Sequence, residues 1–165
     1  MPLEIHEAST ADVEAIVDIL IASKEASLPH LITEHDRNRP FWTERWNKYL
    51  TVGSSAQMSR GDGVALVARE GGRSLGFAAY HHTRRHDADV ELESIYVLKD
   101  VQRRGVGAAL LRAVIERLTR GGDASMCVGY DPKNPYKAFY LKYGATELDP
   151  HWAIWRDIGH LLPPP

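Results

Sequence analysis

The chain has 165 residues, of which 44% are hydrophobic, so it can bury a substantial core in one domain but is short for two. Its formal net charge of −2 argues against a broad surface for nucleic acid or anionic membranes. No apolar run approaches the roughly 20 residues that span a bilayer, and the first residues do not resemble a signal peptide. We therefore expect one domain over residues 1–160 and a Pro-rich tail over 161–165, with neither a membrane nor a nucleic acid as partner.

The first 63 residues predict a strand, two helices and a loop. The strand is expected at residues 3–7, and Ser9 or Thr10 caps the helix that follows and ends before Pro29. After the polar residues 30–40, aromatic residues at helical spacing predict a second helix, whose face packs into the core or lines a pocket. The apolar positions of the two helices are Val13, Ile16, Val17, Leu20 and Ile21, then Trp42, Trp46, Tyr49 and Leu50.

The rest of the chain alternates between strands and helices. A loop over 54–63 precedes a buried strand at 64–68, and the turn Glu70-Gly71-Gly72-Arg73 predicts a hairpin with a strand at 75–81. The later elements are expected at 89–97 (strand), 106–118 (helix ended by Gly121-Gly122), 125–129 (strand), a short helix, and 152–156 (strand). This order predicts an α/β fold with a mixed, mostly antiparallel central sheet flanked by helices.

Cys127 is the only cysteine, and it lies in the apolar stretch 126–128. A single thiol cannot form an internal disulfide, and apolar neighbours favour a buried, inert thiol over a nucleophile. This cysteine usage fits a reducing compartment, so we expect a cytoplasmic protein.

A glycine-containing segment between a predicted strand and helix has the sequence Gln102-Arg103-Arg104-Gly105-Val106-Gly107-Ala108. Helix starts usually carry Asp or Glu, yet no acidic residue occurs between Asp100 and Glu116. Because glycines have no Cβ, the backbone amides can approach an anion closely, while Arg103 and Arg104 attract it. The segment therefore predicts a pyrophosphate site, although the same glycines also suit a tight turn with solvated arginines.

Two familiar phosphate-binding patterns do not fit this segment. The dinucleotide fingerprint requires a glycine where the chain has Leu110, and no Gly-Lys-Ser or Gly-Lys-Thr of a P-loop occurs. Over about residues 91–144, the arrangement Gln/Arg-x-x-Gly-x-Gly/Ala after a strand instead resembles the GNAT superfamily of N-acetyltransferases. The resemblance implies the GNAT fold and acetyl-CoA as cosubstrate, with its pyrophosphate on residues 102–108.

The end of the strand before this segment has a further implied role. In the superfamily this strand end splays from its neighbour and pairs with the pantetheine arm of the cosubstrate. The resemblance therefore implies that Ile95, Tyr96 and Val97 bind mainly through backbone groups. Amides at this place also suit an oxyanion site for the thioester oxygen.

The segment Asn134-Pro135-Tyr136-Lys137-Ala138-Phe139-Tyr140-Leu141-Lys142-Tyr143-Gly144 is similar to a second motif of the superfamily. The resemblance implies that Asn134 hydrogen-bonds the pantetheine arm and that Tyr140 protonates the leaving CoA thiolate. A phenol suits this role because it holds its proton at neutral pH yet can pass it to a nearby anion. Asn134 is also typical of a helix N-cap, and the spacing of the tyrosines is also typical of a core face.

The strand before the glycine segment supplies candidate bases. Side chains alternate along a strand, so Asp89, Glu91 and Glu93 are expected on one face, together with Ile95 and Val97. An acceptor ammonium must lose a proton before its nitrogen can attack a thioester. The superfamily often uses a glutamate of this strand as the base, and either Glu91 or Glu93 fits, with Glu91 the better match in position. Both residues also suit a solvated or salt-bridged strand face.

His81, His82 and His86 lie near Asp87 and Asp89, and these residue types are ordinary metal ligands. Successive strand residues point to opposite faces, so His81 and His82 are not expected to share an ion. We predict no metal site.

These features predict an acetyl-CoA-dependent N-acetyltransferase (EC 2.3.1.-) that acetylates a primary amine of a small molecule or peptide by direct attack in a ternary complex. No covalent intermediate at Cys127 is expected. The alternatives are a non-catalytic acyl-CoA-binding regulatory module and a protein that binds a different nucleotide. No motif identifies the acceptor, whose pocket is expected from residues 28–63 and the C-terminal strand, and a homodimer stays open.

Overall fold

The computed structural model describes residues 2–27, 29–30, 32–51 and 63–161. Within them one sheet has the strand order β1-β2-β3-β4-β5-β7-β6. The strands are β1 (Leu3–Glu7), β2 (Val64–Glu70), β3 (Arg73–His82), β4 (Val90–Val97), β5 (Met126–Gly129), β6 (Thr146–Asp149) and β7 (Trp152–Trp155). The helices are α1 (Val13–Ser27), α2 (Arg39–Thr51), α3 (Val106–Arg120) and α4 (Lys137–Lys142). Among the strands of the described residues, only β4 and β5 pair in parallel, so the predicted mixed, mostly antiparallel sheet is confirmed.

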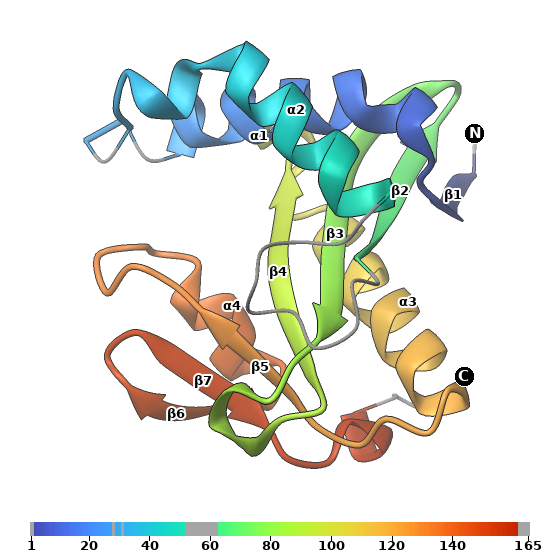
Figure 1. Cartoon of the computed structure of the whole chain (residues 1–165), viewed down its shortest axis with the longest axis vertical. Helices are drawn as coiled ribbons and strands as arrows, with labels where there is room; N and C mark the ends of the chain where they lie inside the picture. The colour runs from blue at the N-terminus through green and yellow to red at the C-terminus, as the bar shows by residue number, and fades with distance from the viewer. Residues whose placement is uncertain (1, 28, 31, 52–62, 162–165) are drawn as a thin grey trace.

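Helices cover both faces of the sheet (Figure 1). Helices α1 and α2 pack on one face and α3 packs on the other, each with its own apolar core. Side chains alternate between the two faces of the sheet along β2, and this explains why there are two cores. Ala65 and Val67 join the α1/α2 core, whereas Leu66 and Ala68 join the α3 core. The apolar side of α3 consists of Val106, Leu110, Leu111, Val114, Ile115 and Leu118.

Most of the predicted elements are present. The hairpin of β2 and β3 turns through Gly71 and Gly72, whose φ angles are 59° and 82°. Strand β6 was not predicted, because it lies at the sheet edge and all its residues are exposed, so it has no apolar alternation. Nearly all of the predicted loop over 54–63, and the tail from 162 onward, lie outside the described residues. Leu161, predicted in the tail, instead ends a 3₁₀ turn and packs against the α3 core.

A β-bulge in β4 corrects the predicted alternation of its side chains. Ala79 pairs with Ser94, and the next residue of β3 pairs with Leu92, so Glu93 is an extra residue in β4. The prediction that Glu91 and Glu93 share a face with Ile95 and Val97 is therefore wrong. The extra residue shifts the later side chains by one position, so Ile95 and Val97 pack with the α3 core while both glutamates face His81.

Strands β4 and β5 separate halfway along β4. They pair only where Val90, Glu91 and Leu92 meet residues 126–128, and Figure 1 shows the two arrows diverging beyond that point. Among the described residues, no strand pairs with the β5 side of residues 93–97. The splayed strand end that the resemblance implies is therefore present, and it leaves an open backbone edge inside the molecule.

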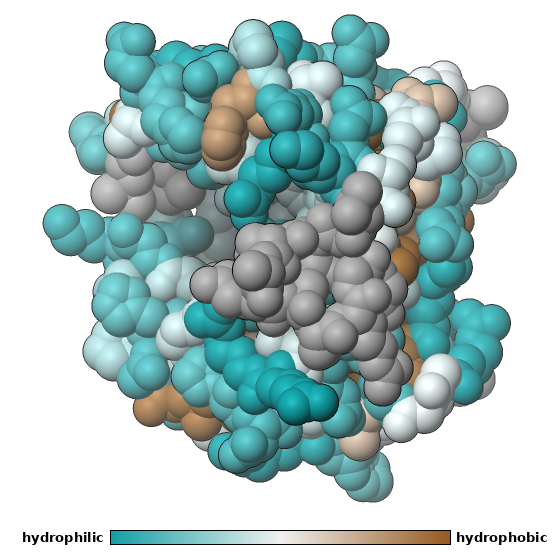
Figure 2. Space-filling view, viewed as in Figure 1, coloured by the Kyte–Doolittle hydropathy of each residue, from teal (hydrophilic) through white to brown (hydrophobic). Residues whose placement is uncertain are grey.

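The surface on the viewed face is mostly hydrophilic, with small, separate hydrophobic patches (Figure 2). Phe41 and Leu148 are the large hydrophobic side chains that stay exposed in the described part of the chain. None of the helices described is both long enough and apolar enough to cross a bilayer.

Candidate active site

The segment before α3 leaves the start of that helix open. Gly105 is the N-cap residue with a φ of 86°, a left-handed conformation that glycine adopts without steric strain. No side chain of the described residues caps the helix, and its first turn holds no acidic residue. A Cβ on Gly107 would lie 3.4 Å from the Phe139 ring, an ordinary van der Waals contact, so this position lies directly against α4. The open N–H groups at the positive end of α3 form a suitable site for an anion.

A cavity of about 730 Å³, here the larger cavity, lies between this segment, the end of β4 and α4. Its volume and its concave shape are those of a site for an extended small molecule. Most of the residues predicted to bind the cosubstrate line it: Ile95, Tyr96, Val97, Gln102, Arg103, Gly105, Gly107, Ala108 and Tyr140.

Three of the predicted cosubstrate residues lie elsewhere. The Arg104 guanidinium pairs with Glu70 at 3.1 Å, and Val106 is buried in the α3 core. Asn134 lines a second cavity, and its Oδ1 accepts the N–H of Tyr136 at 2.8 Å. The N-cap of α4 is Tyr136, which has no side-chain cap, so Asn134 forms an Asx turn just before the helix and is not its N-cap.

Gln102 connects the end of β4 to the start of α4. Its side-chain amide lies 3.1 Å from the Val97 carbonyl oxygen and 3.1 Å from the Tyr136 hydroxyl. Ser23 Oγ donates to the same carbonyl at 3.3 Å. These bonds hold the strand end in place beside the larger cavity.

The second cavity, here the smaller cavity, has a volume of about 300 Å³ and adjoins the larger one, with which it shares lining residues. Its wall carries three carboxylates and one ammonium, and the ammonium of Lys24 pairs with Asp36 at 2.8 Å. The acidic wall favours a positively charged guest, such as an amine in its ammonium form. The shared residues are Ile95, Tyr96, Tyr136 and Tyr140; the others are Lys24, Ile32, Asp36, Glu93, Ser94, Gly129, Tyr130, Asp131 and Asn134.

Tyr140 lies where the two cavities meet. Its side chain is 8% exposed, and its ring stacks on Tyr130 and meets Trp155 edge-on, with centroid separations of 6.1 Å and 6.0 Å. Burial, followed by the neighbouring Tyr96, raises the pKa of Tyr140 well above its usual range. Burial also raises the pKa of Tyr96 to about 12. Both phenols therefore keep their protons at neutral pH, so Tyr140 holds a proton where the two cavities meet.

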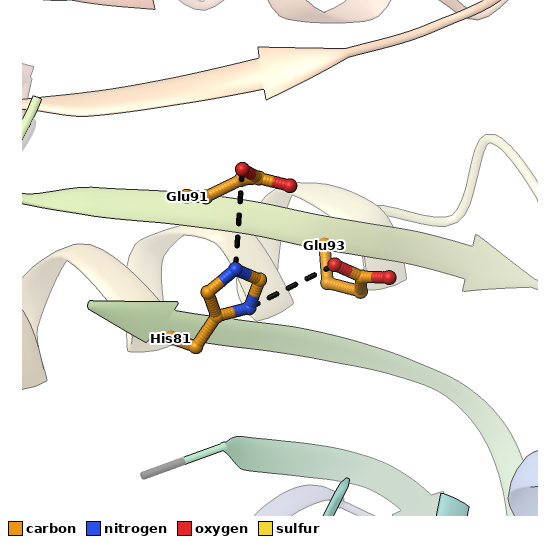
Figure 3. A group of neighbouring side chains, drawn as sticks. All are labelled: His81, Glu91 and Glu93. Carbon is orange, nitrogen blue, oxygen red and sulfur yellow. Dashed lines mark ion pairs between the residues drawn. The ribbon is translucent and has the colours of Figure 1, made fainter. Parts of the chain in front are cut away.

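The bulge of β4 brings Glu91 and Glu93 to the two sides of one imidazole (Figure 3). His81 Nε2 lies 3.9 Å from Glu91 Oε1, and His81 Nδ1 lies 3.7 Å from Glu93 Oε2. Glu93 lines the smaller cavity, whereas Glu91 lies outside the lining of both cavities. Burial raises the pKa of Glu91, and the nearby Glu93 raises it further, while Arg85 at 3.0 Å lowers it.

This cluster is not a clear metal site. One ligand atom from each of His81, Glu91 and Glu93 lies within 4.8 Å of the others, but Arg85 already pairs with Glu91. The Tyr49 hydroxyl lies 3.1 Å from His81 Nδ1, so that nitrogen also has a hydrogen-bond partner. His82 lies on the opposite face, 3.3 Å from Asp123, as the strand alternation predicted.

Several residues of the site carry no sequence signal. Ile32 and Asp36 come from the region expected to form the acceptor pocket, but strand β7 does not line either cavity, and Gly129 and Tyr130 at the end of β5 do. Nothing in the local sequence distinguishes Asp36 or Asp131 from other surface acids. Tyr49 was predicted only as part of an aromatic helix face, which gives no indication of its bond to His81.

Comparisons of sequence relate the whole central part of the chain to one family. The profile of the family described as "Acetyltransferase (GNAT) family" matches residues 24–145. The uncharacterized N-acetyltransferase YuaI of Bacillus subtilis (strain 168) is 39% identical over 146 residues, which are 87% of this chain and 80% of that protein. The uncharacterized N-acetyltransferase Rv2669 of Mycobacterium tuberculosis is 35% identical over 80 residues, which are 48% of this chain and 50% of that protein.

Solved structures show the same fold. The PaiA N-acetyltransferase of Thermoplasma acidophilum, crystallised with coenzyme A, aligns with a TM-score of 0.76 at 17% identity, covering 94% of this chain and 99% of that one. A GNAT family acetyltransferase of Brucella melitensis, crystallised with acetyl-CoA, aligns with a TM-score of 0.63 at 18% identity, covering 94% and 88% of the two chains.

Proposed function

This chain belongs to the GNAT family of acetyltransferases, and we propose that it transfers the acetyl group of acetyl-CoA to a primary amine of a small molecule or peptide by direct attack in a ternary complex. The observation that carries the proposal is the meeting of two cavities at Tyr140. One cavity begins at an anion site and the other has an acidic wall, so a thioester and an amine can enter from different sides.

The larger cavity is the proposed site of acetyl-CoA. The open N–H groups at the start of α3, with Arg103 beside them, suit the pyrophosphate. The unpaired edge of β4 at Ile95 and Tyr96 offers backbone groups to the pantetheine arm. Arg104 remains a weaker candidate, because its guanidinium is paired with Glu70 and would have to leave that carboxylate first.

The smaller cavity is the proposed site of the acceptor. Glu93 is the glutamate on its wall, so we assign it the removal of the ammonium proton, directly or through water. Glu91 was the better positional match in the sequence, but the bulge places it behind His81, outside both cavities. Its proposed role is therefore electrostatic.

Tyr140 is the proposed acid. The amine nitrogen attacks the thioester carbonyl, the carbon–sulfur bond breaks, and the thiolate receives the Tyr140 proton; the phenolate then regains a proton from the acetylated nitrogen. Cys127 takes no part, because it is fully buried and burial raises its pKa to about 12. Its burial is compatible with the proposed cytoplasmic location, and a homodimer remains a proposal.

Release of free CoA thiol in the presence of a panel of primary amines tests the proposed function. We expect release from acetyl-CoA that depends on the amine and saturates with its concentration, and mass spectrometry should find the acetylated amine. Tight binding of acetyl-CoA without amine-dependent release across the panel would favour the regulatory module instead.

A further inference from the structure

We propose that His81 is a positioning residue that stores the proton taken from the acceptor, holding it between Glu91 and Glu93 until the products leave. The inference rests on the proposed function and adds a role for a buried histidine that touches neither substrate. It follows from the arrangement in Figure 3, in which one imidazole lies between two carboxylates.

The three members of the cluster differ in whether they line a cavity. Glu93 lines the smaller cavity, while His81, which is 5% exposed, lies outside the lining of both cavities. The imidazole is therefore the group that Glu93 meets on the side away from the acceptor. Glu91 lies on the far side of the ring and is fixed by Arg85 at 3.0 Å.

The proton balance of the reaction creates the need for a store. An acceptor ammonium carries three N–H protons, of which one stays on the amide and one reaches the CoA thiol through Tyr140. The third passes to Glu93 and must finally reach solvent. While it remains on Glu93, the wall of the smaller cavity has lost one of its carboxylate charges.

Transfer to His81 restores that charge. When Glu93 gives its proton to Nδ1, Glu93 becomes a carboxylate again and the ring becomes an imidazolium that both carboxylates stabilise. The separation of 3.7 Å exceeds a hydrogen bond, so Glu93 must approach by about 0.5–1 Å. After the products leave, the proton returns through Glu93 to the open cavity.

The other groups near the ring are compatible with both protonation states. Nδ1 has one lone pair, so the Tyr49 O–H from α2 must turn away from it before Glu93 delivers the proton, and the hydroxyl oxygen can then accept from the new N–H. Arg45 from α2 lies 3.4 Å from Glu93, and Arg85 pairs with Glu91, so the two carboxylates keep nearby cations of their own. Cys127 on β5 stays a neutral thiol beside Glu91.

The test measures kcat/KM for the acceptor as a function of pH in wild type and three variants. We expect His81→Asn to lower kcat/KM at neutral pH about 10-fold, because the proton taken from the acceptor then stays on Glu93, and to move the acid limb down by about 1 pH unit, because the limb no longer depends on a ring that must be neutral to accept that proton. Glu91→Gln should move the limb in the same direction, because the imidazolium loses one of its two carboxylates. The affinity for acetyl-CoA should not change.

His82→Asn is the matched control, because it makes the same replacement at the next residue, on the opposite face of β3. His82→Asn should leave the acid limb of the kcat/KM profile at its wild-type pH. The proposal is overturned if His81→Asn has the wild-type pH profile, or if both variants lose activity and melting temperature equally, since that result indicates a structural role.

A second measurement does not need an active enzyme. Long-range proton–nitrogen NMR of the histidine rings should show that His81 becomes an imidazolium, and that Glu91→Gln shifts this titration to lower pH. An unshifted titration would overturn the proposal. If no amine supports CoA release by the wild type, the proposed function fails, while the NMR result still decides whether the two glutamates stabilise the charged ring.

Discussion

Among single residues, Tyr140 is the one whose proposed role depends on both cavities of the site. It lines both cavities and is almost completely buried, and its hydroxyl is the group that distinguishes it from a simple packing residue. The motif over residues 134–144 implies a catalytic role for Tyr140. Its burial also fits the core role that the spacing of the tyrosines left open. The two roles are compatible, because the ring packs against Tyr130 and Trp155 while the residue also lines both cavities.

Replacement of Tyr140 by phenylalanine separates these roles. We expect Tyr140→Phe to lower kcat about 10²–10⁴-fold because it removes the proposed acid, while the ring contacts with Tyr130 and Trp155 persist. The affinity for acetyl-CoA, measured by calorimetry, should be nearly unchanged. Tyr80→Phe is a control on another buried tyrosine, whose hydroxyl meets Arg117 away from both cavities. Wild-type turnover in Tyr140→Phe would remove Tyr140 from the mechanism.

Glu91 should affect stability in a way that depends on pH. Burial, followed by Glu93, raises its pKa, so the folded protein keeps this proton at pH values where the unfolded chain has lost it. Folding therefore becomes less favourable as the pH rises from the ordinary value of 4.5 through the raised one, and stays so above it.

Removal of the Glu91 charge should therefore stabilise the protein at pH values above its raised pKa. We expect Glu91→Gln to melt on the order of 2 °C higher than wild type at neutral pH, with the difference vanishing in acid. Thermal melts across the carboxyl range measure this. A difference that is constant with pH would instead indicate a change in packing or hydrogen bonding.

The choice between the two glutamates marks a limit of prediction at this scale. The residue type of the candidate bases and the strand that carries them were predictable, because Glu91 and Glu93 precede a recognisable glycine segment. Which of them reaches a cavity depends on the bulge at Glu93, and a bulge is a property of two paired strands. No pattern within residues 89–97 alone contains that information.

At the scale of elements, the start of α3 is the feature that was predicted best. Its lack of acidic residues and its glycines are visible in the sequence, and the structure shows the uncapped helix and the left-handed Gly105. The same helix ends at a second pair of glycines, where Gly122 has a φ of 89°. Strand β6 had no comparable signal, because an exposed edge strand needs no apolar pattern.

Gly105 and Gly122, one at each end of α3, permit a matched comparison. A Cβ meets nothing within 4 Å at either Gly105 or Gly122, and both φ angles are positive, so alanine should cost about 1–2 kcal/mol of stability at each place. Only Gly105→Ala should also weaken acetyl-CoA binding, by about 10-fold, because it disturbs the amides at the positive helix end. Equal affinities in the two variants, measured by calorimetry, would contradict the proposed pyrophosphate site.

At the scale of the whole molecule, the site joins elements that are far apart in the chain. The larger cavity combines Ser23 of α1, the end of β4 and the tyrosines in and next to α4, and the smaller cavity adds Asp36 and the end of β5. The order of elements predicted the sheet, but this convergence depends on how α1 and α2 lie over the diverging strands (Figure 1). Local sequence patterns do not describe that placement.

A ligand that contacts all these elements should stabilise the fold as a unit. At about 100 times its dissociation constant, CoA should add about 2.7 kcal/mol, which raises the melting temperature by about 5–10 °C in a single transition. ATP and NAD at the same concentration should produce much smaller shifts in the same scan. A larger shift with ATP or NAD would favour the alternative in which the chain binds a different nucleotide.

The divergence of β4 from β5 also affects the molecule when no ligand is bound. Residues 93–97 then present backbone donors and acceptors along a strand that has a neighbour on one side only. Such an edge is a template onto which a foreign extended peptide can add, and from which aggregates can grow. The pantetheine arm would occupy this edge like a surrogate strand, so the cosubstrate would also protect the protein from self-association.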